Sequence, residues 1–124
     1  IEYTLKGAKL GWNKRIISIF EPHLYTRTKD FHTEFAKSLS LSDYVIISDI
    51  YGARENPIEN ITSELITNDL KKMNFKNYIY IKNKNDIPGY LKKIISNNDM
   101  IICMGAGQIN TIINDTIKIV EENL

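Results

Sequence analysis

Several features that would assign a protein to a broad class are scarce in this chain. Its 124 residues include one cysteine, Cys103, so an internal disulfide is excluded. Sixteen basic and fifteen acidic side chains leave a net charge of +1, without the basic excess of a nucleic-acid-binding surface. No apolar run approaches the ~20 residues of a membrane-spanning helix, and the opening IEYTLKGAKLGW lacks the apolar core of a signal peptide. We therefore expect a cytoplasmic protein with neither a nucleic-acid partner nor a membrane partner.

Motifs that carry chemistry by themselves are also missing. The chain has no G-x-x-x-x-G-K-[ST] segment, so it lacks a P-loop for nucleotide phosphates. No Ser/His/Asp order or metal-ligand spacing stands out, and the acids Asp49, Glu55 and Asp86 are scattered along the sequence. Cys103 lies in the apolar run MIICMG, which favours a buried and inert thiol. The sequence thus identifies no catalytic residue and predicts no metal site.

The chain does contain short apolar runs that alternate with amphipathic segments. The runs are rich in β-branched and aromatic residues, as in strands buried on both faces of a parallel sheet. They cover residues 16–20, 44–50, 78–81 and 100–104. Helical spacing precedes the first run and follows each of the four. This order predicts an α/β fold, a three-layer Rossmann-like domain with a mostly parallel sheet of at least four strands and helices on both faces. We expect residues 1–124 to form a single domain.

Polar side chains mark where the helices are expected to begin. Three of them precede helical segments and are predicted to cap them: Thr28, Thr62 and Asp86. In the helix after Thr28, one face carries Phe31, Phe35 and Leu39. A last helix is expected from about Gln108. Residues 1–12 also have helical spacing but no preceding cap, which suggests that the chain is a piece of a longer protein.

Ligands of open α/β sheets bind beyond the carboxyl ends of the strands. The loops at that edge are predicted to be residues 21–27, 51–60, 82–85 and 105–107. Lysine outnumbers arginine thirteen to three, yet Arg27 and Arg54 both fall in these loops. A planar guanidinium suits a carboxylate or phosphate, so both are candidate binding residues, with a surface salt bridge or helix packing as the alternative. His23 follows a proline directly after a strand, which makes it a third candidate, with a structural role as the alternative.

Neighbouring residues at the predicted edge are less specific. Tyr51 and Glu55 either line the same pocket or stabilise their loop. His32 lies on the polar side of its helix, and we assign it no role. The segment MGAGQI contains only G-x-G and follows the last strand, so it is a weak dinucleotide signature. Its glycines are expected to permit a tight strand-to-helix turn whose exposed N–H groups face the site.

Three segments, EPHLYTRT, DIYGARE and MGAGQI, follow the first, second and last predicted strands in this order. Together they resemble the C-terminal domain of the bacterial Mur ligases, and within that family the branch that joins L-alanine to UDP-N-acetylmuramate. That branch carries QPH-x-[YF]-[TS]-RT, a segment like DI[YF]GARE, and GAG-[DN]-I at the corresponding places. The resemblance extends over essentially the whole chain. Residues 1–12 fit the family's helix after a DDYGHHP motif, which is absent here.

The resemblance implies that the chain is the C-terminal, acceptor-amino-acid domain of a larger three-domain ligase. Such an enzyme uses ATP and Mg²⁺, bound mainly by an upstream central domain, to turn the lactyl carboxylate of UDP-N-acetylmuramate into an acyl phosphate. The amine of L-alanine then attacks through a tetrahedral adduct, in a step of peptidoglycan precursor synthesis. The N-terminal domain binds the UDP-sugar. The C-terminal domain helps to bind L-alanine and to close over ATP, so this fragment alone is expected to be inactive.

The resemblance also implies roles for particular residues. His23 and Arg27 match family positions at the carboxylate of the incoming amino acid, and Arg54 is a further candidate for the same contact. The chain departs from the family pattern where Glu21 replaces the usual Gln and Leu24 replaces Arg or Thr, which excludes a direct ligand role for position 24. Gln108 replaces an acid or Asn, and no role is assigned to it.

Two other interpretations of the sequence stay open. One is a free-standing Rossmann-like module that binds a nucleotide or a small acid, which would need a complete reading frame from about Ile1. The other is the domain of a related ligase that recycles a muropeptide by adding a tripeptide. The segment EPHLYTRT favours the alanine-adding branch over the tripeptide-adding one.

Overall fold

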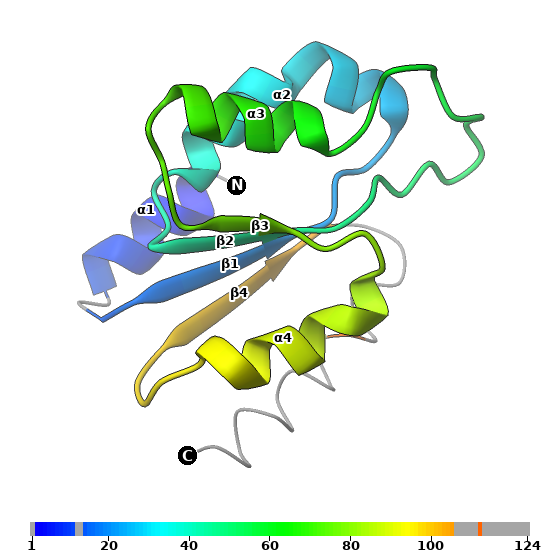
Figure 1. The fold of residues 1–124 in the computed structure, drawn as a ribbon. Helices are drawn as coiled ribbons and strands as arrows, with labels where there is room; N and C mark the ends of the chain where they lie inside the picture. The colour runs from blue at the N-terminus through cyan, green and yellow to red at the C-terminus, as the bar shows by residue number, and fades with distance from the viewer. Residues whose placement is uncertain (1, 12–13, 106–111, 113–124) are drawn as a thin grey trace.

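The computed structural model describes residues 2–11, 14–105 and 112, in which helices alternate with short strands (Figure 1). The elements are α1 (Glu2–Gly11), β1 (Ile16–Phe20), α2 (Tyr25–Leu39), β2 (Tyr44–Ile47), α3 (Glu64–Lys72), β3 (Tyr78–Tyr80), the 3₁₀ turn η1 (Lys84–Asp86), α4 (Ile87–Ile94) and β4 (Met100–Met104). The start of the predicted last helix, near Gln108, lies outside the described residues. Ile112, which is described, is helical and buried.

The four strands form one parallel sheet in the spatial order β3-β2-β1-β4. The central strand β1 pairs with β2, where Ile17 lies opposite Tyr44, and with β4, where Ile16 lies opposite Met100. Helices α2 and α3 cover one face of the sheet, and α4 covers the other (Figure 1). The predicted α/β class, with a parallel sheet between two helical layers, is therefore confirmed.

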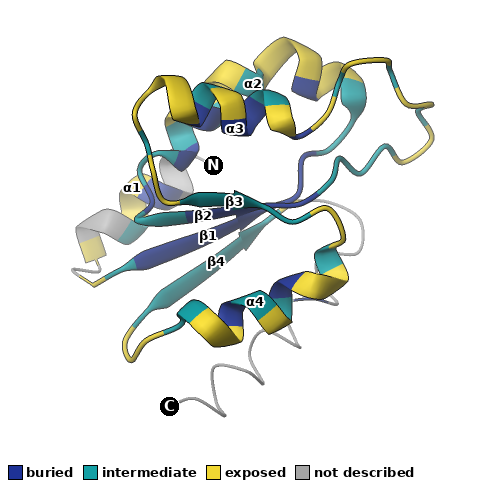
Figure 2. Ribbon diagram, viewed as in Figure 1, coloured by how far each residue is buried: buried dark blue, intermediate teal, exposed yellow. Residues whose placement is uncertain are grey.

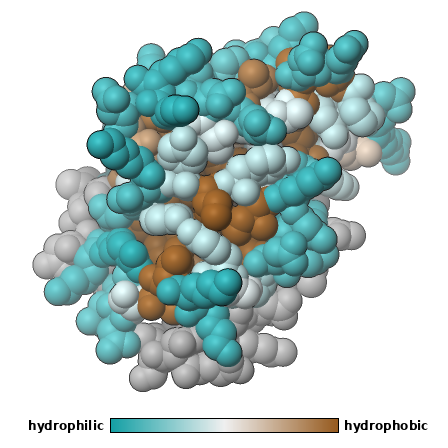
Figure 3. Space-filling view, viewed as in Figure 1, coloured by the Kyte–Doolittle hydropathy of each residue, from teal (hydrophilic) through white to brown (hydrophobic). Residues whose placement is uncertain are grey.

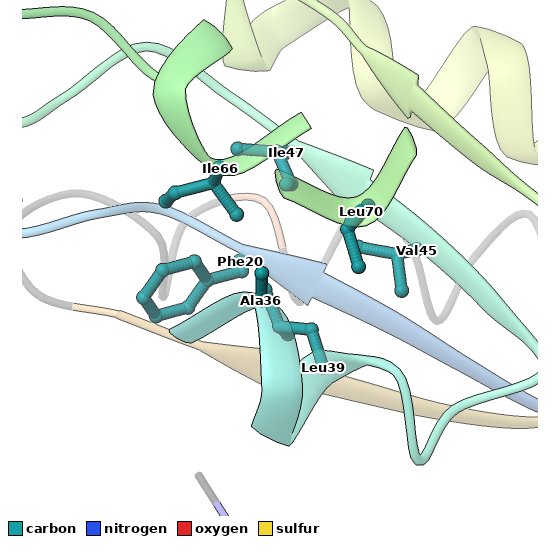
Figure 4. Packing of buried hydrophobic residues seen from close by; sticks show 7 residues of the cluster. All are labelled: Phe20, Ala36, Leu39, Val45, Ile47, Ile66 and Leu70. Atoms are coloured by element: carbon teal, nitrogen blue, oxygen red, sulfur yellow. The ribbon is translucent and has the colours of Figure 1, made fainter. Parts of the chain in front are cut away.

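Two apolar clusters, one on each face of the sheet, hold the layers together. Buried residues lie along β1 and β2 and on the inward sides of the helices, whereas β3 and β4 are half-buried (Figure 2). One cluster contains Phe20, Ala36, Leu39, Val45, Ile47, Ile66 and Leu70 (Figure 4). The other contains Ile17, Ile19, Ile46, Ile87, Leu91 and Ile112. Successive strand side chains point to opposite faces, so both faces of β1 and β2 are apolar, which explains their nearly continuous apolar sequence.

Strands β1 and β4 begin and end where the sequence predicts, whereas β2 and β3 end earlier, at Ile47 and Tyr80. Beyond Ile47 the chain leaves the regular ladder. The Ser48 carbonyl accepts a hydrogen bond from the Ser63 hydroxyl at 2.5 Å, and Tyr51 pairs with the segment after β1. The prediction of a strand to residue 50 is thus wrong, because these last residues turn toward α3 and toward the end of β1.

Helix α2 begins at Tyr25, three residues before the predicted cap. Thr28 lies inside the helix, where its hydroxyl donates to the Leu24 carbonyl at 2.9 Å, so the prediction that Thr28 caps the helix is wrong. The first amides of α2 are bound instead by the carboxylate of Glu55, thirty residues along the chain, which no local pattern reveals. The apolar face predicted for α2 includes Phe31, but this residue is 48% exposed and therefore lies outside the buried face of the helix.

Of the other two predicted caps, Asp86 is at the N-cap position of its helix, whereas Thr62 lies one residue before the N-cap, so the prediction for Thr62 is wrong. The Thr62 hydroxyl accepts a hydrogen bond from the Glu64 amide at 3.2 Å, but the N-cap position of α3 belongs to Ser63. Asp86 is the N-cap residue of α4, yet its side chain makes no capping bond. The side chain of Asn83 closes the preceding turn η1 by accepting a hydrogen bond from the Asn85 amide.

The face of the molecule seen in Figure 3 is mostly polar outside the sheet. Hydrophilic residues cover the outer side of α2 and α3, and apolar residues are visible between that layer and α4, beside the sheet (Figure 3). Strand β3 is the edge strand there, and its three residues are half-buried. None of the helices in the described ranges is long and apolar enough to cross a bilayer.

Candidate functional site

The segments that follow β1 and β2 meet at the carboxyl-end edge of the sheet. The Tyr51 amide donates to the Pro22 carbonyl at 2.8 Å, and the Leu24 amide donates to the Tyr51 carbonyl at 2.9 Å. The rings of His23 and Tyr51 stack, with centroids 5.9 Å apart and 17° between their planes. A parallel bridge therefore continues past the strand ends and holds the half-buried His23 at this edge.

The carboxylate of Glu55 closes the start of α2. It accepts hydrogen bonds from the Tyr25 amide at 2.6 Å, the Thr26 amide at 3.3 Å and the Thr26 hydroxyl at 2.6 Å. These bonds, with that of the Thr26 hydroxyl foremost, and the charge of His23 hold the pKa of Glu55 below its usual value. Of the two roles open for Glu55, the structure shows the second: it ties the loop of residues 51–60 to α2.

The backbone of this junction is constrained at two positions. Leu24 has a φ of 72°, a left-handed conformation that costs a non-glycine residue of order 1–3 kcal/mol. It is held there because its carbonyl accepts the Thr28 amide at 3.1 Å while its own amide binds Tyr51. Gly52 lies so close to Tyr25 that a Cβ would stand 2.7 Å from a ring carbon. Position 24 thus contributes its backbone to the edge.

The two candidate arginines are exposed beside this junction. Arg27 lies in the first turn of α2, and Arg54 lies in the loop of residues 51–60. Within the described part of the chain, no hydrogen bond or ion pair engages either guanidinium. The structure therefore places His23 against Tyr51 and near the charge of Glu55, and it leaves the guanidinium groups of Arg27 and Arg54 available to a ligand.

A cavity of about 290 Å³ lies next to the junction, lined by Glu21, Ser48, Asp49, Ile50, Tyr51, Lys82, Asn83 and Lys84. Glu21 is 1% exposed, and its Oε2 accepts a hydrogen bond from Lys84 Nζ at 2.7 Å. Its other oxygen has no hydrogen-bond partner in the described structure. Lys84 also lies 5.5 Å from the ring centroid of Tyr51. Lys84 is one lysine among thirteen, and no local pattern distinguishes it from the others.

Asp49 stands between this cavity and a second one of about 370 Å³ under the loop of residues 51–60. Its carboxylate accepts a hydrogen bond from the Tyr80 hydroxyl, and burial raises its pKa, with Lys82 acting in the opposite direction. Glu21 and Glu55 are likewise bound by protein groups. Among the described residues, no group of three or more potential metal ligands occurs, so this edge offers no ready cation site there.

The turn after β4 begins in close contact with β1. The Glu21 amide donates to the Met104 carbonyl at 3.0 Å. Gly105 has a φ of 156°, and a Cβ on it would lie 2.9 Å from both the Cβ and the carbonyl oxygen of Glu21. The first glycine of MGAGQI therefore permits close backbone approach, as expected of a tight turn. The rest of that turn, including Gln108, lies outside the described residues.

His32 and Cys103 lie away from this edge of the sheet. His32, to which we assigned no role, pairs through Nδ1 with the Asp69 carboxylate and so joins α2 to α3. Cys103 is half-buried between the sheet and α4, and burial raises the pKa of its thiol to about 11. The prediction of an inert thiol agrees with this environment, because the reactive thiolate is disfavoured.

The comparison with known families decides the assignment. A family described as "Mur ligase, glutamate ligase domain" matches residues 1–107. This chain belongs to that family. Among curated Mur ligases, the UDP-N-acetylmuramate–L-alanine ligase of Geotalea daltonii is 37% identical over 109 residues, which are 88% of this chain and 24% of that protein. The protein of the same name from Pelotomaculum thermopropionicum is 37% identical over 99% of this chain and 27% of its own length.

The chain therefore spans about a quarter of the length of the curated Mur ligases that it matches. A solved structure gives the same picture of the fold. The murein peptide ligase of Psychrobacter arcticus superposes with a TM-score of 0.76 at 18% identity, covering 99% of this chain and 25% of that one. At that identity the likeness establishes the shared Mur ligase fold alone.

Proposed function

We propose that the chain is the C-terminal domain of a three-domain, ATP-dependent ligase that joins L-alanine to UDP-N-acetylmuramate in peptidoglycan precursor synthesis. The observation that carries this proposal is that relatives 36–41% identical over 81–99% of the chain bear this activity in their names. The N-terminal and central domains would lie upstream in the same protein. The ligase would act in the cytoplasm, where ATP and UDP-linked sugars are available.

In this proposal, His23 and Arg27 hold the carboxylate of L-alanine, and Arg54 contributes from the neighbouring loop. The stacked imidazole and the two guanidinium groups, which have no partner within the described ranges, support this role. When a planar guanidinium fixes the carboxylate of L-alanine, the amine of L-alanine is directed toward the reacting centre. The nitrogen lone pair attacks the acyl-phosphate carbon of the muramate, a tetrahedral adduct forms, phosphate leaves, and the nitrogen loses a proton to give the amide.

ATP and Mg²⁺ are assigned mainly to the upstream central domain. The acids at the described edge are engaged by protein partners, namely Glu21 by Lys84, Asp49 by Tyr80 and Glu55 by α2. The described residues therefore do not fit a magnesium site. In this proposal, the chain helps to enclose ATP by closing over the central domain.

Steady-state kinetics of the longer protein that carries this chain test the role of Arg27. Losing one charged hydrogen bond removes about 1.5–3 kcal/mol of binding, so Arg27→Ala should raise the KM for L-alanine about ten- to a hundredfold. The KM for ATP should change little. Lys29→Ala, an exposed basic residue two positions along α2, is the matched control. An unchanged KM for L-alanine in Arg27→Ala would refute the assignment of Arg27.

A second candidate function has one observation in its favour, the fold shared with a murein peptide ligase. The sequence relatives argue against it, because they are twice as similar and carry the alanine-adding name. Ligation assays that compare L-alanine with a tripeptide as the acceptor separate the two activities. The reading frame upstream of Ile1 tests the free-standing module, since a P-loop motif encoded there would exclude it.

A further inference from the structure

Three segments that follow different strands converge on Lys84. This residue lies in η1, after β3, and its Nζ is 2.7 Å from Oε2 of Glu21, the residue that follows β1. The same Nζ lies 5.5 Å from the ring centroid of Tyr51, after β2. The Tyr51 ring in turn stacks on His23. A continuous chain of contacts therefore connects Lys84 with a candidate ligand residue far earlier in the sequence.

The burial of Glu21 determines where the Lys84 side chain lies. The Glu21 side chain is 2% exposed, and its Oε1 has no hydrogen-bond partner in the ranges that the structure describes. A buried carboxylate is costly unless an opposite charge compensates it. The Lys84 ammonium supplies that charge, and this ion pair holds the otherwise flexible side chain of Lys84 at the edge. The Asn83 side chain closes the turn η1 and so fixes the backbone at Lys84.

We propose that Lys84 is a positioning residue of the amino-acid site. Glu21 holds the Lys84 ammonium against the Tyr51 ring, and Tyr51 holds the His23 imidazole in the orientation that meets a carboxylate. An ammonium group is attracted to the face of an aromatic ring, so its removal frees Tyr51 to rotate and takes the stacked partner from His23. The role at the carboxylate rests on the proposed function, whereas the coupling of Lys84 to His23 is a property of the fold.

The coupling is measurable in the 124-residue chain by NMR of the histidine rings. The chain has two histidines, and His32 is an internal control because it pairs with Asp69 between α2 and α3. In Lys84→Met, the ring signals of His23 should shift as the Tyr51 ring moves, and those of His32 should not. Lys84→Arg should retain the wild-type His23 signals. Lys82→Met, the matched control at an exposed lysine of the same loop, should move neither set.

A double variant keeps this test valid if Lys84→Met fails to fold with Glu21 left unpaired. Glu21→Gln/Lys84→Met removes both charges, so it leaves no buried charge to destabilise the fold. It should show the same shift of the His23 signals. A folded double variant whose His23 signals coincide with those of the wild type would overturn the proposal.

Kinetics of the longer protein separate this proposal from the proposed function. The double variant should raise the KM for L-alanine about tenfold, with kcat and the KM for ATP near wild type, because the change acts through His23 on carboxylate binding. If the His23 signals shift while the KM for L-alanine stays constant, the carboxylate role of His23 is wrong and the coupling stands. If the signals stay in place, the positioning role of Lys84 is wrong, whatever the kinetics.

Discussion

The two edges of this sheet use arginine in opposite ways. At the amino-end edge, Arg15 donates to the Asp99 carboxylate from Nε at 3.2 Å and from Nη2 at 2.6 Å, and to the Ile94 carbonyl at 2.5 Å. At the carboxyl-end edge, Arg27 and Arg54 are exposed and have no partner among the described residues. Arginine therefore serves the structure at one end of the strands and remains available where ligands of open α/β sheets bind.

Backbone and carboxylate groups show the same contrast. At the amino-end edge, the Asp43 carboxylate accepts the Ile16 amide at 2.7 Å, and Asp99 accepts the Ser96 amide at 2.8 Å. At the carboxyl-end edge, Glu21 keeps one buried oxygen with no hydrogen-bond partner in the described structure. Left-handed backbone occurs at both edges, but at the amino end it falls on Asn74 and Asn98, a residue type that adopts it readily, whereas at the carboxyl end it includes Leu24. Strained backbone and unsatisfied buried polar groups cost stability, so they are kept mainly where a functional site requires them. The contrast supports the carboxyl-end edge as the functional one.

The largest expected effect is a loss of stability at the amino-end edge. Arg15→Ala leaves the Asp99 side chain, which is 4% exposed, without its cation. Since Arg15 is partly exposed, we expect a loss of about 2 kcal/mol, below the value for a fully buried pair. Arg27→Ala should change the free energy of unfolding by less than about 0.5 kcal/mol. Urea denaturation of both variants measures the difference, and similar losses in the two would contradict the contrast.

Two glycine substitutions should change stability in opposite directions. Gly105→Ala places a Cβ against the backbone of Glu21, so we expect it to destabilise the fold by about 1–1.5 kcal/mol, toward the lower end of the cost of a strained backbone. Gly89 lies in α4 with nothing within 4 Å of its added Cβ, and Gly89→Ala should stabilise the helix by about 0.5–1 kcal/mol. Thermal melts compare the two variants. A melting temperature that does not fall in Gly105→Ala would show that the edge tolerates a side chain there.

The smallest expected effect is a pH dependence at the start of α2. The pKa of Glu55 is lowered in the folded state, so its ionised form contributes stability above the usual value of 4.5, and this is lost as pH falls through the folded pKa. Glu55→Gln should therefore melt below wild type at neutral pH, with a difference that shrinks in acid. Thr26→Val, which removes the foremost donor, should show a smaller change of the same sign. If the difference in melting temperature did not change with pH, the ionised carboxylate of Glu55 would not be the group that stabilises the start of α2.

The sequence predicts most of the fold and only part of the site. The sequence predicts β1 and β4 at their observed bounds because each apolar run stops where the residue type changes, at Arg15 and Glu21 around β1 and at Asp99 and Gly105 around β4. The start of α2 was misplaced because its capping carboxylate, Glu55, comes from a loop thirty residues away. Lys84 could not be recognised, since its position depends on the burial of Glu21 after an earlier strand. Local patterns thus define the elements, while contacts between strand-following loops define the edge.

In the proposed ligase, the carboxyl-end edge of the sheet receives the carboxylate of the acceptor amino acid. A crystal structure of the longer protein with L-alanine and an ATP analogue tests it most directly. We expect the carboxylate oxygens of L-alanine to lie within hydrogen-bond distance of the Arg27 guanidinium and next to the His23 ring. A bound L-alanine whose carboxylate is held only by residues outside this chain, with Arg27 turned to solvent, would contradict it.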